Sequence, residues 1–285
     1  MNRVIERTMI VPNMHLLVIE APEISSKVRP GQFVIIRAND EGERIPLSVA
    51  DWNKEQGTVT TVFMEVGAST GALASLEKDD AVATCVGPLG NSTEIGRFGT
   101  VLLIAGCYGI GSIYPVAKEL KAAGNQVITV LEARSSYLIY WAKRFASLSE
   151  KIFSVTRDGS LGMKGHITRL TEIIHSLPQP PDRVIVNGCT YLMAHTSEVT
   201  RELGIPTLVN LNPIMIDGTG MCGVCRVTVG GQMKFACVDG PEFDGHKVDW
   251  KEFLSRRKAY MSEETLFFRH SEPHTKAHKE GKCQA

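Results

Sequence analysis

The fold of this 285-residue chain is decided by one stretch, Val101-Leu102-Leu103-Ile104-Ala105-Gly106-Cys107-Tyr108-Gly109-Ile110-Gly111. It opens with a continuous apolar run of strand length, and the turn with Gly106, Gly109 and Gly111 leads into a helix predicted over 112–123. Backbone N–H groups and a helix N-terminus then meet at one point, where the pyrophosphate of a nucleotide could bind. The same kind of turn also occurs in α/β folds that bind no nucleotide.

After this stretch, apolar strands alternate with helices. The sequence predicts strands over 126–131, 152–156, 183–186 and 207–211, and helices over 137–145, 167–176 and 192–203. This alternation predicts a parallel sheet covered by helices. The carboxyl ends of parallel strands share one edge, so Asp158 and Gly159, which follow another strand, are further candidate nucleotide-binding residues. At this edge Glu132 could bind a ribose hydroxyl and Arg134 a 2′-phosphate, or either could be a solvated surface residue.

The first hundred residues contain short strands separated by turns. Strands are predicted over 9–11, 16–19, 33–37, 58–66 and 81–86. Their spacing, with no long helix between them, predicts a small β-barrel or sandwich. We therefore expect four parts: a β-barrel over 1–98, an α/β nucleotide-binding domain over 99–212, a compact cysteine-bearing domain over 213–250 and an extension over 251–285.

The compact region contains three closely spaced cysteines. Cys222 and Cys225 are separated by two residues, and Cys237 follows after eleven more. Plant-type [2Fe–2S] sites use the spacing C-x4-C-x2-C with a distant fourth cysteine, and here Asp217 stands in place of the first cysteine. We expect these four residues to hold a [2Fe–2S] cluster. The alternatives are a structural zinc site with the same thiolates, buried cysteines without a metal, and an Asp217 that only caps the loop.

Composition excludes several classes of function. The chain has 31 Lys plus Arg, 31 Asp plus Glu and a formal net charge of zero. A nucleic-acid-binding protein needs a basic excess to neutralise phosphates, so we expect no nucleic-acid partner. No apolar run reaches the length of a membrane span, and the N-terminus lacks the apolar core of a signal peptide, which predicts a cytoplasmic protein.

The final segment is polar and rich in histidine. His270, His274 and His278 recur every four residues, with Cys283 beyond them. These residues could form a metal site, but Pro273 interrupts the helix that would align the histidines. A solvated or partner-docking extension is the other interpretation.

The order of barrel, nucleotide-type domain and cysteine-rich loop resembles the ferredoxin-reductase superfamily. Within it, the chain is similar to the electron-transfer subunit of dihydroorotate dehydrogenase and to the small subunit of NADH-dependent ferredoxin:NADP oxidoreductase. The motifs that carry the resemblance are Pro30-Gly31-Gln32-Phe33, Arg44-Ile45-Pro46-Leu47-Ser48, Gly67-Ala68-Ser69-Thr70, Gly87-Pro88-Leu89-Gly90-Asn91 and the segments 210–222 and 238–243. In small subunits of this kind Asp replaces the first cysteine, which supports Asp217 as a ligand.

The resemblance implies an FAD site on the barrel. The strand with Pro46, Leu47 and Ser48 would contact the flavin, with a hydrogen bond from Ser48 to the isoalloxazine, and Arg44 would neutralise phosphate charge. The segment with Gly67, Ser69 and Thr70 resembles the loop that holds the FAD pyrophosphate.

Two departures from the family pattern concern these sites. The family's arginine often sits three residues before the serine, where this chain has Ile45. The nicotinamide loop usually reads G-G-V-G-x-A-P, and Cys107, Gly111 and Ser112 here replace Gly, Ala and Pro. The motifs therefore support FAD more directly than they support NAD(H) or NADP(H).

The resemblance implies an oxidoreductase subunit that moves electrons between NAD(P)H, FAD and a [2Fe–2S] cluster. Its partner would be a larger iron–sulfur flavoprotein, and the complex would be of the ferredoxin:NADP oxidoreductase type. The chain would then exchange electrons with ferredoxin only indirectly, through this partner. Some complexes of this type bifurcate electrons. The chain would be active only with that partner, and we expect no catalytic side chain of its own. The alternatives are a subunit of another dehydrogenase, acting on dihydroorotate or sulfide, and a relay or scaffold subunit with a degraded nicotinamide site.

Overall fold

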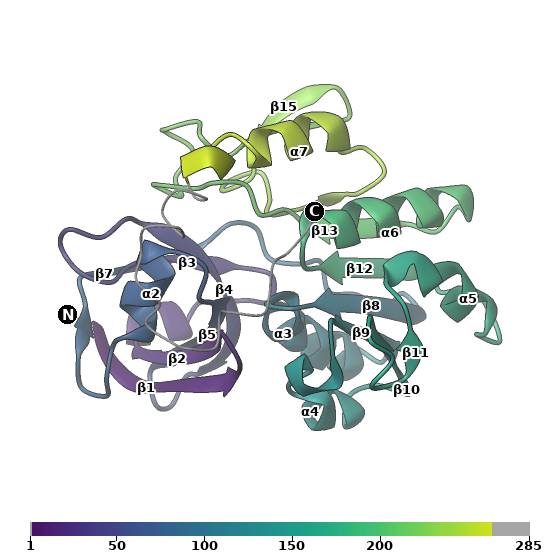
Figure 1. The fold of residues 1–285 in the computed structure, drawn as a ribbon, viewed down its shortest axis with the longest axis horizontal. Coiled ribbons are helices and arrows are strands. Elements are labelled where there is room, and N and C mark those ends of the chain that lie inside the picture. The colour runs from purple at the N-terminus through teal and green to yellow at the C-terminus, as the bar shows by residue number, and fades with distance from the viewer. Residues whose placement is uncertain (1, 264–285) are drawn as a thin grey trace.

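The computed structural model describes residues 2–263, which form three parts packed against one another (Figure 1). The first part is a seven-stranded antiparallel sheet in the order β6-β1-β2-β5-β4-β3-β7, curled into a barrel-like shape. Its elements are β1 (Asn2–Val11), β2 (Met14–Glu20), α1 (Pro22–Ser25), β3 (Phe33–Arg37), β4 (Ile45–Asn53), β5 (Thr58–Met64), α2 (Ala68–Ala74), β6 (Ala81–Val82) and β7 (Thr84–Leu89). Alternate side chains, among them Leu17, Val34 and Phe63, fill its core.

Among the elements of this part that differ from the sequence prediction, two belong to the predicted FAD site: β4 and α2. The apolar pattern alone does not predict β4, because Pro46 and Ser48 interrupt it, but the strand that the family resemblance implies at Pro46, Leu47 and Ser48 is present and pairs with β3 and β5 on either side. The loop expected over 67–70 is wrong, because Gly67 is the N-cap of α2 and the helix begins at Ala68. The Thr70 hydroxyl accepts the N–H groups of Val66 and Gly67 at 2.9 and 3.1 Å, which fixes this start.

The second part is a seven-stranded sheet in the order β11-β10-β9-β8-β12-β13-β16. Its strands are β8 (Thr100–Gly106), β9 (Gln126–Ala133), β10 (Lys151–Thr156), β11 (Met163–Lys164), β12 (Arg183–Asn187), β13 (Thr207–Asn210) and β16 (Glu242–Asp244). All neighbours are parallel except β16, which pairs antiparallel with β13. The predicted parallel α/β sheet is confirmed, and its edge strand comes from the compact region further along the chain.

Helices cover both faces of this sheet (Figure 1). The helical elements are α3 (Gly109–Ala122), η1 (Ser136–Leu138), α4 (Ala142–Ala146), η2 (Ile167–Arg169), α5 (Leu170–His175) and α6 (Thr190–Glu202). Leu102 and Ile104 of β8 pack on the side of α5 and α6, whereas Val101 and Leu103 pack on the side of α3 and α4. A strand buried on both faces reads as a continuous apolar run, which is why residues 101–105 predict it so directly.

The helix predicted over 137–145 is wrong. The chain forms the short turn η1, then passes through Trp141 in the left-handed region at φ 55° before α4 begins at Ala142. Tertiary contacts favour this break. The Tyr140 hydroxyl is bonded to the glycine turn after β8, and the Trp141 ring packs 5.3 Å from Tyr114 and 4.4 Å from the Arg144 guanidinium.

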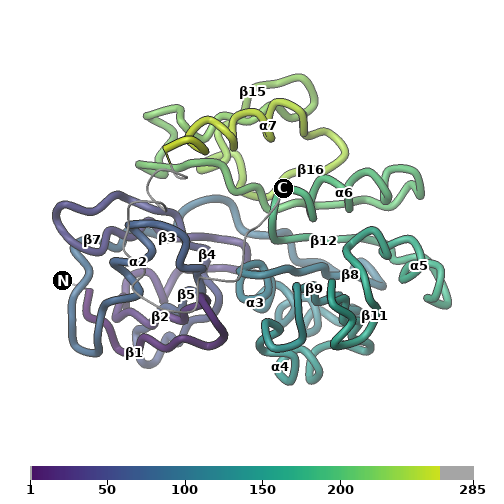
Figure 2. The backbone as a smooth tube through the Cα atoms, viewed as in Figure 1, coloured from purple at the N-terminus to yellow at the C-terminus, as the bar shows by residue number. Residues whose placement is uncertain are grey.

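The third part lies across the other two (Figure 2). It contains the hairpin of β14 (Arg226–Val229) and β15 (Gln232–Phe235) and the helix α7 (Trp250–Arg257). Asp249 caps α7 by accepting the Glu252 N–H at 2.9 Å, and Phe253 is buried in one core with Cys225 and Cys237. The backbone N–H of Asn91, after the barrel, donates to Gly240 at 2.6 Å and joins this part to the first.

The histidines of the tail, His270, His274 and His278, lie outside the described residues, as does Cys283. Within residues 2–263, no helix is both long and apolar enough to cross a membrane.

Candidate functional site

The hairpin of the third part brings two of the predicted metal ligands together. Arg226 pairs with Phe235 across the hairpin, so Cys225 directly precedes β14 and Cys237 follows β15 by two residues. Their Sγ atoms lie 3.2 Å apart, and both residues are buried. Cys222 lies three residues earlier on the same loop and is exposed.

Asp217 closes this loop from the other side. Its Oδ1 accepts the N–H of Thr219 at 2.9 Å and its Oδ2 accepts the N–H of Cys222 at 3.0 Å. These backbone hydrogen bonds hold the pKa of Asp217 below its ordinary value. The carboxylate is therefore ionised and held at the backbone of Cys222, a position compatible both with capping the loop and with binding metal.

The glycines of the loop allow it to pack tightly. Gly218, Gly220 and Gly223 have φ values of 77°, 83° and 68°, in the left-handed region that side chains disfavour. A Cβ on Gly218 would lie 2.7 Å from the Leu89 side chain of β7 and 3.1 Å from that of Ile35 in β3. The cysteine loop thus rests directly on the barrel.

The donor set fits an iron–sulfur cluster. Burial, followed by the neighbouring Cys225, raises the pKa of the Cys237 thiol to about 12, so this thiol would stay protonated without a cation beside it. In residues 2–263, no three His, Cys, Asp or Glu side chains are gathered for a single metal ion. A two-iron cluster divides its four ligands between two metal ions and accepts a wider spacing.

The glycine turn after β8 is shaped by packing. A Cβ on Gly109 would lie 2.1 Å from the carbonyl oxygen of Asn187 in β12, and one on Gly111 would lie 2.9 Å from the Cβ of Val62 in β5. Cys107 adopts φ 52°, a conformation that suits the glycine found in related turns. These glycines join α3 to the sheet and to the barrel, and their nucleotide role stays a prediction.

Two tyrosines that the sequence analysis missed hold this turn. The Tyr140 hydroxyl accepts the N–H of Gly111 at 2.8 Å and donates to the carbonyl of Cys107 at 3.0 Å. The Tyr108 hydroxyl donates to the carbonyl of Gly188 at 2.7 Å. Burial raises the pKa of both phenols, so both stay protonated. A lone tyrosine in a wrongly predicted helix carries no sequence signal for this role.

At the carboxyl edge of the sheet, Asp158 forms a local turn. Its Oδ1 accepts the N–H and the hydroxyl of Ser160 at 2.9 and 2.6 Å, and Gly159 between them has φ 76°. Hydrogen bonds from Ser135 and then from Ser160 lower the pKa of Asp158 to about 2. The structure thus places Asp158 and Gly159 on the edge that carries the glycine turn.

Glu132 at the end of β9 is buried, so its interpretation as a solvated surface residue is wrong. Its Oε1 lies 3.1 Å from Nε2 of His166, and its Oε2 has no hydrogen-bond partner among the described residues. Burial raises the pKa of Glu132 to about 7, and this effect outweighs the positive charge of Arg157, which lowers the pKa. Burial, followed by the charge of Arg157, lowers the pKa of His166 to about 4.

The barrel presents the residues implied for FAD on two elements. Pro46 and Ser48 of β4 are half-buried and share one face, opposite Leu47, which packs in the barrel core. Arg44 is exposed just before this strand. Gly67, Ser69 and Thr70 lie at the N-terminal turn of α2, where backbone N–H groups favour a phosphate.

The barrel, the parallel sheet and the cysteine loop define a ferredoxin-reductase-like fold with an iron–sulfur binding domain. Residues 212–249 match the model of the iron–sulfur cluster binding domain of dihydroorotate dehydrogenase B. The chain is 44% identical over 268 residues to a dihydroorotate dehydrogenase B (NAD(+)) electron transfer subunit homolog of Thermotoga maritima, covering 94% of each protein. It is 31% identical to the electron transfer subunit of Desulforamulus reducens, covering 85% of this chain and 95% of that protein.

A solved structure of NADH-dependent reduced ferredoxin-NADP oxidoreductase, described in relation to flavin-based electron bifurcation, contains a similar chain. The two superimpose with a TM-score of 0.89 at 44% identity, covering 94% of this chain and 97% of the other. The chain belongs to the family of dihydroorotate dehydrogenase B electron-transfer subunits and their homologues.

Proposed function

We propose that this chain takes electrons from NAD(P)H through FAD and a [2Fe–2S] cluster and exchanges them with a larger iron–sulfur flavoprotein. Electron transfer is the function of the family; the nucleotide donor and the dependence on a partner are the proposal. One observation carries it: the loop with the buried thiols of Cys225 and Cys237 packs at Gly218 against strands β3 and β7 of the barrel. A cluster held there would adjoin the barrel on which the flavin is expected.

We propose Cys222, Cys225, Cys237 and Asp217 as the cluster ligands. For FAD we propose the face of β4 with Pro46 and Ser48, and Leu47 as the core residue that fixes this strand. Arg44 would pair with phosphate, and the α2 turn with Gly67, Ser69 and Thr70 would hold the pyrophosphate. When bound, FAD supplies the exchange between a two-electron hydride and single electrons, and the protein positions the cofactors.

For the nicotinamide nucleotide we propose the turn with Gly106, Gly109 and Gly111, together with Asp158 and Gly159 on the same sheet edge. The role of the chain is to orient the nucleotide, since no side chain needs to exchange a proton during hydride transfer. We also retain as proposals the domain limits 1–98, 99–212, 213–250 and 251–285, and a cytoplasmic location.

A relay subunit without nicotinamide activity is the second candidate. It is favoured by the exposed side chain of Cys107 in the turn and by Tyr140, whose hydroxyl already takes the N–H of Gly111. Reduction by NADH separates the two candidates, because a relay subunit would keep its flavin oxidised.

Cofactor content tests the ligand set. We expect Cys237→Ser to lose iron and acid-labile sulfide while it retains FAD, and Cys85→Ser, a half-buried barrel cysteine, to retain all three. Chemical assay of iron, sulfide and flavin in the purified variants measures this. Full iron content in Cys237→Ser would contradict the ligand set.

A further inference from the structure

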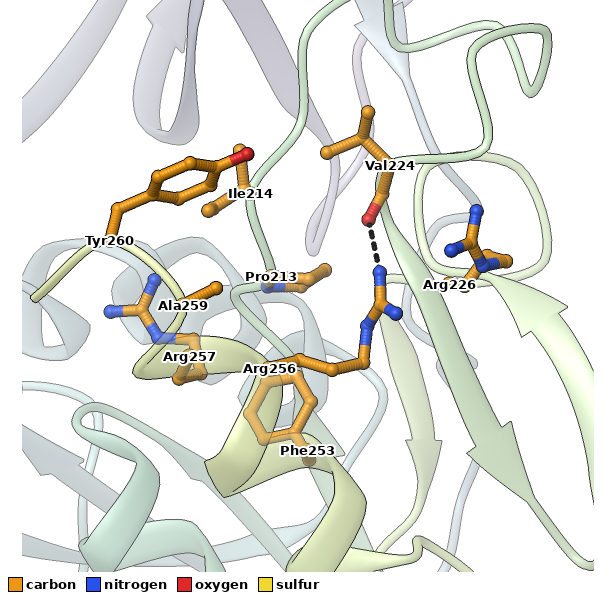
Figure 3. Close-up of a pocket in the computed structure, with 9 residues that line it drawn as sticks. All are labelled: Pro213, Ile214, Val224, Arg226, Phe253, Arg256, Arg257, Ala259 and Tyr260. Carbon is orange, nitrogen blue, oxygen red and sulfur yellow. Dashed lines mark hydrogen bonds between the residues drawn. The ribbon is translucent and has the colours of Figure 1, made fainter.

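A small pocket lies behind the cysteine loop, between that loop and α7 (Figure 3). It has a volume of about 140 Å³ and is lined by Pro213, Ile214, Val224, Arg226, Phe253, Arg256, Arg257, Ala259 and Tyr260. The apolar side chains include the buried Phe253, and three arginines supply all the formal charge of the lining. α7 follows directly after residue 249, where the match to the iron–sulfur binding domain ends.

The three arginines are not neutralised within residues 2–263. Arg226 donates to the carbonyl of Gly223 at 2.9 Å and Arg256 to that of Val224 at 3.1 Å, and Figure 3 shows the second bond. Among the described residues, no carboxylate lies within 4.0 Å of the guanidinium group of Arg226, Arg256 or Arg257. Three uncompensated cations around one concavity form a site for an anion.

The surroundings of the pocket indicate a protein rather than a small molecule. Met221 on the cysteine loop is 88% exposed, and Ile216, Leu254 and Tyr260 are also exposed apolar residues of this part. Exposed apolar side chains together with arginine are typical of a protein–protein interface. Pockets for drug-sized ligands measure about 300–1,000 Å³, so this one matches a single side chain.

We propose that this pocket receives an acidic side chain, Asp or Glu, of the larger iron–sulfur flavoprotein that docks over the cysteine loop. The proposal rests on the proposed function for the identity of the partner. A guanidinium fork pairs with a carboxylate through two parallel hydrogen bonds, which adds orientation to charge attraction. Because Arg226 and Arg256 also hold the backbone between Cys222 and Cys225, the contact fixes the partner beside the loop that would carry the cluster.

Arg257 is the residue to change, because no hydrogen bond or ion pair links its side chain to the described residues. The test uses the full chain with its cofactors and the purified larger subunit, separated from the isolated complex and identified by mass, flavin and iron content. Dissociation constants are measured by titration at two salt concentrations. We expect Arg257→Glu to weaken binding about tenfold or more and to reduce its salt dependence, with an unchanged visible spectrum.

The matched control is Arg97→Glu, which makes the same charge change at an exposed arginine between the barrel and β8. Equal affinities for the Arg257→Glu and Arg97→Glu variants would overturn the docking proposal and leave the proposed function intact. Equal affinities of the two variants for the larger subunit, together with inorganic phosphate that binds to wild type and not to Arg257→Glu, would overturn the docking proposal in favour of a small-anion site. Failure of the wild-type chain to bind the larger subunit would instead contradict the partner in the proposed function, and the docking proposal with it.

Discussion

Asp217 stands where plant-type sites have a cysteine, and its two carboxylate oxygens receive the N–H groups of Thr219 and Cys222. This arrangement holds the loop in shape before any metal binds. An oxygen ligand donates less electron density to iron than a thiolate does, so Asp217 in its proposed role as a ligand would tune the cluster.

We expect Asp217→Cys to bind the cluster and to change both its visible spectrum and its midpoint potential. A fourth thiolate adds electron density to iron, which should lower the potential. Visible spectroscopy and a redox titration of the purified variant measure these changes. A spectrum and a potential equal to those of wild type would show that Asp217 caps the loop and is not a ligand.

Tyr140 is the residue on which the geometry of the glycine turn depends. Replacing Tyr140 by Phe leaves the N–H of Gly111 and the carbonyl of Cys107 without their shared partner in a buried position. We expect a loss of about 1–3 kcal/mol in the free energy of unfolding and a several-fold higher KM for NADH, with kcat little changed. Urea unfolding of the chain and steady-state kinetics of its complex with the larger subunit measure both.

The control for Tyr140 is Tyr137→Phe, which removes the hydroxyl of a neighbouring exposed tyrosine. It should leave stability and KM at the wild-type values. An unchanged KM in Tyr140→Phe, in an enzyme that NADH does reduce, would show that the turn needs no such support.

At the scale of elements, the predictable part of the fold is the part that local sequence determines. β8 was identifiable because a strand buried on both faces must be apolar throughout, and α3 because glycines flank it at both ends. β4 and the broken helix before α4 depend on pairing partners and on Tyr140 reaching a turn some thirty residues away. Such distant contacts leave no local pattern.

In the candidate site, too, some features are predictable from local sequence and others depend on contacts between distant residues. The spacing of Cys222, Cys225 and Cys237 predicts a metal site, since a two-residue gap and a glycine loop are visible in sequence. The proximity of Cys225 to Cys237 depends on the hairpin, and the pocket of Arg257 depends on α7, which lies where the sequence predicts only an extension.

Phe253 is the buried residue of α7 and packs this helix against the third part. Phe253 is 2% exposed and shares a core with Cys225 and Cys237. We expect Phe253→Ala to lower the free energy of unfolding by about 3–5 kcal/mol, because a cavity replaces the ring. Leu254→Ala, at the exposed neighbouring position, should change it by less than about 0.5 kcal/mol. Urea denaturation of both variants measures this, and equal losses would contradict the packing.

At the scale of the whole molecule, the barrel and the second sheet are joined through Glu242 of β16. Its Oε2 accepts the hydroxyl of Thr93, in the link between these two parts, at 3.0 Å. Burial raises the pKa of Glu242 from 4.5 to about 7, an effect larger than the opposing hydrogen bond from Thr93. The folded protein therefore holds a proton here that the unfolded chain would release.

The pH dependence follows from this shift. Between about pH 4.5 and 7 the folded state binds more protons at Glu242 than the unfolded state, so its contribution to stability falls as pH rises. We expect Glu242→Gln to be more stable than wild type at pH 8. We also expect the free energy of unfolding of this variant to fall less steeply than that of wild type as pH rises. Urea unfolding from pH 5 to 8 measures it, with exposed Glu55→Gln as control. Parallel curves for Glu242→Gln and wild type would contradict the assignment.

The central claim is that one chain connects a nicotinamide nucleotide to a flavin on the barrel and to a cluster in the cysteine loop. Anaerobic titration of the purified, cofactor-loaded protein with NADH or NADPH, followed by visible and electron paramagnetic resonance spectroscopy, tests it most directly. We predict that one of the two nucleotides bleaches the flavin absorbance and produces the signal of a reduced [2Fe–2S] cluster. An oxidised flavin and a silent cluster, in protein that dithionite does reduce, would contradict the account.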